Sequence, residues 1–163
     1  MRALITLTSV LVMNTAIAGI GDSLESAKKK YGAVVETSTY RPDLYPTSYI
    51  FQAASAKIEV TPLPSAISRL DVFFASSPSE PVETLLERYS GRSGWKSRPL
   101  ADAEFVREFP LFSTTTPKNR FFVADGVFAL VQSDVGDHKL VIAIQSADYL
   151  GQLHEYRKKK KGP

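Results

Sequence analysis

Two short segments with the apolar spacing of an amphipathic helix recur in the chain, and each precedes a run of strand-like sequence. Their apolar faces consist of Leu24, Ala27 and Tyr31 in the first segment and Val82, Leu85, Leu86 and Tyr89 in the second. Gly32 and Gly91 follow these segments, at the position where glycine commonly ends a helix. The spacing therefore predicts two helices that each bury one face against a common sheet.

Strand patterns after each predicted helix show the alternation or the β-branched content of half-buried strands. They are Ala33–Thr39, Ser48–Ala54, Lys57–Thr61 and Ile67–Phe74 in the first half, and Arg120–Ala124, Val127–Ser133 and Leu140–Gln145 in the second. Asp125-Gly126 is typical of a two-residue hairpin turn with positive φ at both positions. We expect an α+β fold with two helices packed on one face of an antiparallel sheet of about six strands. A tandem α-β-β-β repeat and a chance similarity of short helices are both open explanations of the recurrence.

Residues 1–18 have the pattern of a secretory signal peptide. Met1-Arg2 gives a basic start, residues 3–12 are mostly apolar, and Ala16 and Ala18 are the small residues that precede a cleavage site. The alternative is a membrane anchor, but a spanning helix needs about 20 apolar residues, and this run is shorter. The pattern predicts cleavage after Ala18 and a soluble periplasmic or secreted protein with no transmembrane segment after cleavage.

The chain has no cysteine, which excludes disulfides, thiolate nucleophiles and thiolate metal sites. Lipid attachment to a cysteine after the cleaved leader is excluded as well. We expect a single α+β domain over residues 19–156 that is stabilised by its apolar core. Residues 157–163 offer no apolar side chain to bury, so the sequence predicts a disordered basic tail there.

The charge of the chain is unevenly distributed. The formal net charge is +3, but Arg2 would leave with the leader and the tail carries five cations, so residues 19–156 carry −3. These five cations are Arg157, Lys158, Lys159, Lys160 and Lys161. The tail is a candidate binding site for an anionic surface polymer or lipid, and a merely solvated end is the alternative. An acidic body with a short basic end argues against specific nucleic-acid binding.

Aromatic residues provide a second set of candidate binding residues. Tyr40, Tyr45 and Tyr49 cluster around a proline-rich loop, and Trp95 lies in an irregular segment. Tyr and Trp contribute large contact areas to a partner at a low entropy cost, which makes these four residues candidates for binding. The alternative is that the rings cover the ends of the sheet.

Motifs for catalysis or cofactor binding are absent from the sequence. The nearest serine pattern, Ser90–Gly94, lacks the spacing of a nucleophile elbow. His138 follows Asp134 and Asp137 closely, which is compatible with a metal ion but also typical of a polar hairpin turn. We therefore expect no catalytic residue, no metal site and no cofactor.

Several local features together resemble a group of small, exported bacterial proteins that are themselves uncharacterised. These features are Tyr31-Gly32, Lys57–Val60, Leu70–Phe74, Thr84–Glu87 with Gly94-Trp95 beyond it, and Asp125-Gly126. In architecture the chain is similar to the β-lactamase-inhibitor-protein-like group, although it lacks that group's disulfide cysteines. The resemblance implies helices packed on an antiparallel sheet and assigns no functional residue.

These observations favour an exported, non-catalytic binding or envelope-associated protein. Its expected partner is an envelope protein or an anionic surface polymer or lipid. The alternative function is a small hydrolase that acts on a cell-wall or extracellular polymer, which would require a pocket holding a histidine or a pair of carboxylates.

Overall fold

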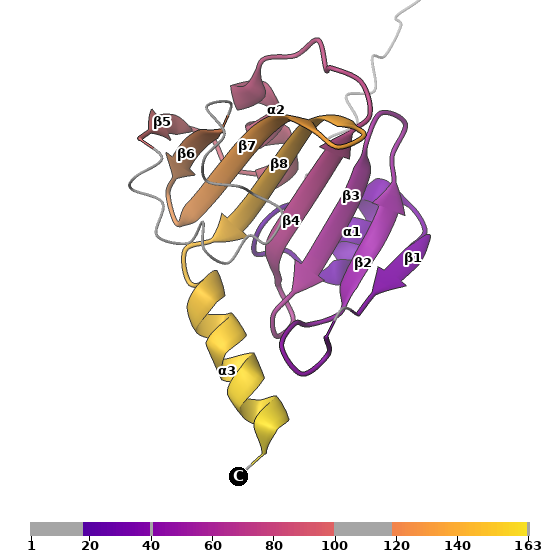
Figure 1. Ribbon diagram of the computed structural model, residues 1–163, viewed down its shortest axis with the longest axis vertical. Coiled ribbons are helices and arrows are strands. Elements are labelled where there is room, and N and C mark those ends of the chain that lie inside the picture. Colours follow the sequence, from indigo (N-terminus) through magenta and orange to yellow (C-terminus); the bar gives the residue numbers. More distant parts are fainter. Residues whose placement is uncertain (1–17, 40, 100–118, 163) are drawn as a thin grey trace, which may run out of the picture.

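The computed structural model describes residues 18–39, 41–99 and 119–162, and within them the chain forms three helices and one eight-stranded antiparallel sheet (Figure 1). The elements are α1 (Leu24–Tyr31), β1 (Glu36–Ser38), β2 (Ser48–Gln52), β3 (Lys57–Pro62), β4 (Ile67–Phe74), α2 (Val82–Ser90), β5 (Lys96–Arg98), β6 (Arg120–Ala124), β7 (Val127–Val135), β8 (His138–Ser146) and α3 (Tyr149–Lys161). The expected α+β fold with an antiparallel sheet is confirmed; the sheet has eight strands where about six were expected, and α3 is present besides the two helices expected to pack on the sheet.

The element order is one helix followed by four strands, twice, with α3 added at the end. The strand order across the sheet is β1-β2-β3-β4-β8-β7-β6-β5. The last strand of each half, β4 or β8, therefore lies at the centre, and the first strand of each half lies at an outer edge. The two halves are equivalent in topology, which agrees with the recurrence seen in the sequence.

Helices α1 and α2 cover the same face of the sheet, the far face in Figure 1. Alternate residues of the central strands point to this face, because side chains alternate along a strand. The main core combines Ala27 of α1 and Leu85 and Leu86 of α2 with fully buried strand residues. These strand residues include Phe51, Ile58, Val60, Leu70, Val72, Ala129, Val131, Ile142 and Ile144. One continuous core therefore joins both halves.

The segment before α1 is part of this core. Ala18 and Gly19 are buried, and the Ala18 carbonyl accepts hydrogen bonds from Lys30 Nζ at 3.2 Å and from the Tyr31 hydroxyl at 3.1 Å. A Cβ atom at Gly19 would lie 2.0 Å from the Ser90 carbonyl oxygen, so no larger residue fits there without moving the backbone. Residues 1–17, which hold the rest of the expected leader, lie outside the described residues.

The predicted hairpin at Asp125-Gly126 is present, and Ala124 pairs with Val127 on either side of it. Gly126 has the expected positive φ of 68°, but Asp125 does not share it. Gly91 ends α2 in the left-handed conformation, as expected. The sequence predicts this turn and the end of α2 correctly because both depend on local backbone geometry alone.

Strand β5 was not predicted, because its three residues are polar and exposed and show no alternation. It forms by pairing with β6, where Lys96 lies opposite Val123 and Arg98 opposite Phe121. A short edge strand of this kind depends on its neighbour and has no apolar pattern of its own.

The basic end of the chain differs from the predicted disordered tail, because α3 continues through Lys161. Contacts with the loop before β2 explain the difference. The Tyr156 hydroxyl donates to the Pro42 carbonyl at 2.9 Å, and Arg157 Nε donates to the Leu44 carbonyl at 2.9 Å. Among the described residues, no helix has both the length and the apolar character needed to cross a membrane.

Candidate functional site

The open face of the sheet, opposite α1 and α2, is divided into an apolar and a polar zone. Strands β6, β7 and β8 place Phe121, Leu130 and Val141 on it, in a small apolar cluster. Strands β3 and β4 place charged residues on the same face, since Asp71 of β4 pairs with Ala143, which belongs to that apolar cluster. The charged zone is the unusual feature, because charged side chains are rarely buried on a central strand.

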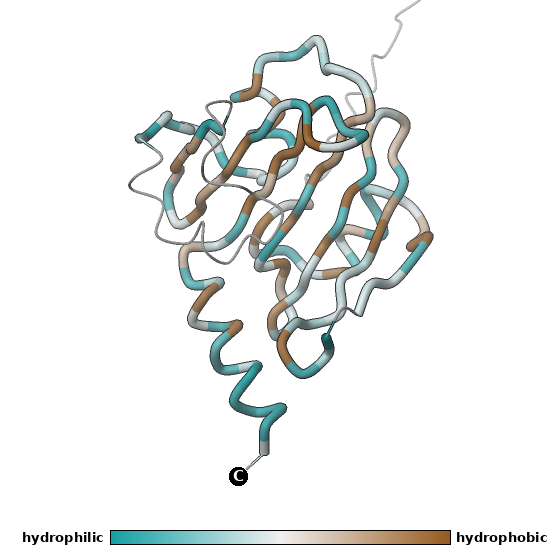
Figure 2. The backbone as a smooth tube through the Cα atoms, viewed as in Figure 1, coloured by the Kyte–Doolittle hydropathy of each residue, from teal (hydrophilic) through white to brown (hydrophobic). Residues whose placement is uncertain are grey.

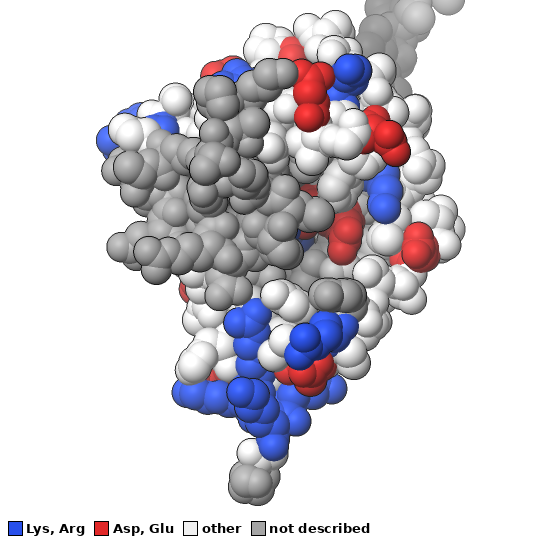
Figure 3. Space-filling model, in the orientation of Figure 1, with Lys and Arg blue, Asp and Glu red and all other residues white. Residues whose placement is uncertain are grey.

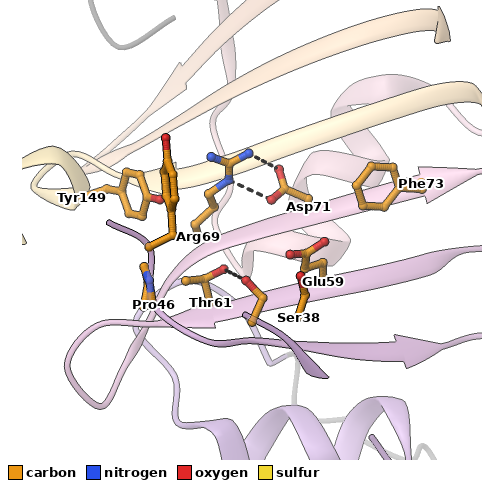
Figure 4. A pocket seen from close by; sticks show the side chains of 10 residues that line it. Ser38, Pro46, Glu59, Thr61, Arg69, Asp71, Phe73 and Tyr149 are labelled. Carbon is orange, nitrogen blue, oxygen red and sulfur yellow. Dashed lines mark hydrogen bonds and ion pairs between the residues drawn. The ribbon is translucent and has the colours of Figure 1, made fainter. Parts of the chain in front are cut away.

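A cavity of about 400 Å³ lies over this polar zone (Figure 4). Its lining comes from β1 to β4, from the loop before β2 and from the first residue of α3. The lining residues are Ser38, Tyr45, Pro46, Ser48, Glu59, Thr61, Arg69, Asp71, Phe73 and Tyr149. We call this cavity the open-face pocket.

Arg69 and Asp71 form a two-pronged ion pair in the open-face pocket. Arg69 Nε lies 2.8 Å from Asp71 Oδ2, and Nη2 lies 3.1 Å from Oδ1. The two residues are two positions apart on β4, so both point to the open face (Figure 4). Their side chains are only 13% and 8% exposed. Burial, the largest single cause, lowers the pKa of Arg69, but attraction to Asp71 and Tyr149 and the hydrogen bonds to both together outweigh burial and raise this pKa, so the guanidinium stays charged.

Glu59 places a second carboxylate beside this pair. It lies directly opposite Asp71 in the β3–β4 ladder, so both carboxylates leave the same face from Cα atoms about 4.5–5.5 Å apart. Burial, and then repulsion by Asp71, raises the pKa of Glu59, and a hydrogen bond to Ser48 works against the rise. Glu59 therefore takes up a proton more readily than an ordinary glutamate does.

Three aromatic rings form the apolar walls of the open-face pocket. Each has a cation of the chain near it, which is a favourable arrangement because the ring face is electron-rich. The pairs, with the distance from the cationic centre to the ring centroid, are Arg69 and Tyr149 (6.0 Å), Arg157 and Tyr45 (5.2 Å), and Lys57 and Phe73 (5.6 Å). Burial raises the pKa of Tyr149, so its hydroxyl stays protonated and can donate a hydrogen bond.

Further polar groups adjoin the ion pair. Ser48 Oγ and Thr61 Oγ1 form a buried hydrogen bond of 2.8 Å on the floor of the pocket. Gln145 lies opposite Arg69 in the β4–β8 ladder, and its buried Oε1 has no hydrogen-bond partner among the described residues. Buried polar atoms are nearly always paired, so an unpaired acceptor beside Arg69 is unusual in a region built for packing alone.

The structure separates the aromatic residues that the sequence singled out. Tyr45 lines the open-face pocket. Tyr49 packs against the main core on the other face, and Trp95 is buried there at 9% exposure, with its Nε1 donating to the Arg92 carbonyl. Tyr40 lies outside the described residues. The structure therefore brings one of the four to the pocket.

The predicted basic residues gather at one end of the molecule, over α3 (Figure 3). The second half of α3 is hydrophilic, in contrast to its first turns (Figure 2). Arg157 is hydrogen-bonded to the loop before β2, and Lys158 forms an ion pair with Glu155 at 2.8 Å. Lys159 also lines a second cavity of about 520 Å³ between α3 and the loop after β3. Lys158–Lys161 thus form a helical surface outside the open-face pocket, whereas Arg157 lies against the pocket's Tyr45 wall.

The residues around His138 form a hairpin connection. Val135 pairs with His138 across the turn, Asp134 binds Lys139 at 3.3 Å, and the His138 ring lies 5.1 Å from that of Phe73. Within the described ranges, no group of three or more histidine or acidic side chains is placed to hold a metal ion.

The sequence analysis did not identify the charged residues of the pocket. Glu59, Arg69 and Asp71 lie within segments that were predicted correctly as strands, but their meeting depends on the register between β3 and β4. The available signal was a charged residue at alternate positions of two otherwise apolar strands. Tyr149, which comes much later in the chain than Asp71, is one of the apolar residues of a helix pattern in the sequence and gave no signal of a pocket residue.

Comparison with known proteins adds little to this picture. No protein family and no curated protein matches the chain. A crystal structure of a cysteine-rich secretory protein from Staphylococcus aureus subsp. aureus Mu50 aligns with 80% of this chain, at 12% sequence identity and a TM-score of 0.41. The chain covers 46% of that protein. A TM-score of this size supports no inference about fold or function, so the functional argument depends on the geometry of the site.

Proposed function

We propose that the chain is an exported, non-catalytic binding protein of the cell envelope whose ligand occupies the open-face pocket. The observation that carries the proposal is the buried Arg69–Asp71 ion pair, with Glu59 beside it, in a cavity of about 400 Å³. Export is inferred from the leader pattern in residues 1–18.

The energetics of buried charges support a binding role. A buried ion pair contributes little net stability, because the cost of removing both charges from water offsets their attraction. An apolar residue at position 71 would pack as Val141 does on β8. Charged groups in a concave pocket offer directed hydrogen bonds to a ligand, which is the usual arrangement in small-molecule sites.

A specific observation also favours the second candidate, a hydrolase that acts on a cell-wall or extracellular polymer. Glu59 and Asp71 are adjacent carboxyl groups with different environments, since Glu59 has a raised pKa and Asp71 is paired with Arg69. Polymer hydrolysis by two carboxyl groups needs one protonated and one ionised member. In such a mechanism Glu59 would donate the proton and Asp71 would act as the carboxylate.

Ligand-induced stabilisation tests the binding proposal. The purified chain is heated with a panel of neutral sugars, amino acids, polyamines, organic acids and soluble cell-wall fragments. A ligand at about 100 times its Kd raises the stability by about 2.7 kcal/mol, which corresponds to roughly 5–10 °C in Tm for a chain of this size. Ser38→Trp fills the mouth of the pocket and should abolish the shift.

Thr37→Trp is the matched control, because Thr37 is exposed and pairs with Tyr49, whose side chain packs on the opposite face. A shift that survives both substitutions would place the ligand elsewhere, and no shift with any compound would contradict the proposal. Release of reducing ends from cell-wall polymer, abolished by Glu59→Gln, would instead support the hydrolase.

A further inference from the structure

The pattern of charges in the open-face pocket discriminates between classes of ligand. We propose that the pocket takes an uncharged sugar ring, an inference that rests on the proposed binding function. Each class of ligand meets a different set of fixed groups in the pocket.

An anionic ligand meets two carboxylates. Glu59 and Asp71 lie side by side on β3 and β4, and the guanidinium of Arg69 is already bonded to Asp71 through two nitrogens. A ligand anion would therefore compete with Asp71 for Arg69 and would meet the charge of Glu59 directly. Like charges placed together in an interface cost several kcal/mol, so anions are disfavoured.

A cationic ligand meets cations that already occupy the aromatic walls. Lys57 lies 5.6 Å from the Phe73 ring centre and Arg157 lies 5.2 Å from that of Tyr45. A ligand ammonium would have to displace one of these groups or lie near it, although it would gain from Glu59. Among the described residues that line it, the pocket thus offers no empty aromatic cage of the kind that cation recognition uses.

An uncharged sugar ring suits what remains. Its hydroxyls donate and accept hydrogen bonds, which matches the Glu59 carboxyl group, the buried Ser48 and Thr61 hydroxyls and the Tyr149 phenol. Its C–H groups can contact the ring atoms of Tyr45, Phe73 and Tyr149 that line the cavity, without displacing the cations near these rings. A volume of about 400 Å³ is within the range of small-ligand sites.

A matched series of sugars tests the inference, because glucose, glucosamine and glucuronate share one ring and differ in charge. The same three-member series based on galactose and on mannose are titrated as well, so that the result does not depend on the stereochemistry of glucose. Calorimetric titration at pH 6.5, where the amine is protonated and the acid ionised, should show the neutral member of at least one series binding about tenfold or more tightly than both charged members.

Two variants identify the charge responsible. Glu59→Gln removes the repulsion and should raise the affinity for the uronate relative to that for the neutral sugar. Glu83→Gln removes an exposed acid of α2, on the far face of the sheet, and should leave the ratio unchanged. Tighter binding of a charged sugar, no sugar binding in any series, or a ratio unmoved by Glu59→Gln would overturn the inference. A thermal shift with a non-sugar compound, lost in Ser38→Trp, would keep the binding function while rejecting the sugar.

Discussion

The two halves of the sheet share a frame but differ on the open face. Aligning Leu70 with Leu140 superimposes the sequence of β4 on that of β8, so that Val72 corresponds to Ile142. These four residues all point into the main core. On the open face, the same alignment maps Asp71 onto Val141, which belongs to the small apolar cluster.

This difference separates what the fold requires from what it does not. The residues that face α1 and α2 are apolar in both halves, because both halves need a core. On the open face the second half carries Val141 where the first half carries Asp71, which pairs with Arg69 and lies beside Glu59. The fold therefore does not require a carboxylate at position 71, since the equivalent position of the second half holds a valine.

The largest expected effect comes from removing one member of the ion pair. Arg69→Met leaves Asp71 buried and without its bonded partner, so we expect a loss of about 3–5 kcal/mol in the free energy of unfolding. Arg69→Met with Asp71→Val copies the valine of the second half, and should be neutral or stabilising by up to about 4 kcal/mol. Urea unfolding measures both. Equal destabilisation of the single and double variants would show that the pair stabilises the fold.

Equivalent core positions should respond alike. Leu70→Ala and Leu140→Ala each remove a buried leucine at corresponding places, and each should cost about 2–5 kcal/mol. Chemical denaturation of the two variants under identical conditions checks this. A large loss at one position with almost none at the other would break the equivalence of the halves.

Helix α3 stands outside the repeated order of one helix and four strands, and it contacts the loop before β2. Tyr156→Phe removes the hydroxyl that donates to the Pro42 carbonyl, and should cost about 1 kcal/mol. Because this loop carries Tyr45 and Pro46 to the pocket wall, its backbone amides should exchange with solvent faster. His154→Ala, at an exposed position of α3, is the control. Unchanged exchange in the loop would show that α3 does not position the wall.

Glu59, which belongs to the first half, should make the free energy of unfolding of the protein depend on pH. Because its pKa is higher in the folded state than in the unfolded chain, the folded protein binds this proton more tightly. This contribution is fully present below the ordinary pKa of glutamate and is lost as the pH rises through the raised value. Glu59→Gln should therefore gain stability over the native chain near pH 7, and the difference should vanish as the pH falls below about 4. Unfolding curves at the two pH values test this sign.

The smallest expected effect on stability comes from the basic end. Substituting Lys158, Lys159, Lys160 and Lys161 by Gln should change the free energy of unfolding by no more than about 0.5 kcal/mol, because these side chains are exposed. Retention on vesicles of anionic phosphatidylglycerol at low salt should nevertheless fall, since each cation near such a surface contributes about 1 kcal/mol. Neutral phosphatidylcholine vesicles serve as the control. Equal retention of the native and substituted chains would show that the basic end does not bind anionic lipid and is only a solvated surface.

Local patterns in the sequence predicted the frame well. The apolar faces of α1 and α2, the strand alternation and the Asp125-Gly126 turn each depend on residues close in the chain. Strand β5 and the end of α3 could not be predicted in this way, because each is stabilised by a partner that is distant in sequence.

The pocket was harder to predict for the same reason. Glu59 and Asp71 belong to different strands and meet only through strand register, and Tyr149 arrives from the opposite end of the sequence. Tyr49 and Trp95 were candidate binding residues but pack in the main core. The sequence does not separate the two cases, because an aromatic side chain has the same sequence signature in a core as in a binding site.

The burial of Ala18 and Gly19 bears on the order of events in the life of the chain. A processing enzyme that cuts after Ala18 needs an extended, accessible backbone, and in the folded protein this bond is enclosed against the Ser90 carbonyl. Any cut there must therefore come before folding is complete. The new ammonium group of Gly19 would then be set beside Asp22, whose carboxylate already accepts from the Gly19 nitrogen at 2.7 Å, so that processing would tie the freed end into the fold with an ion pair.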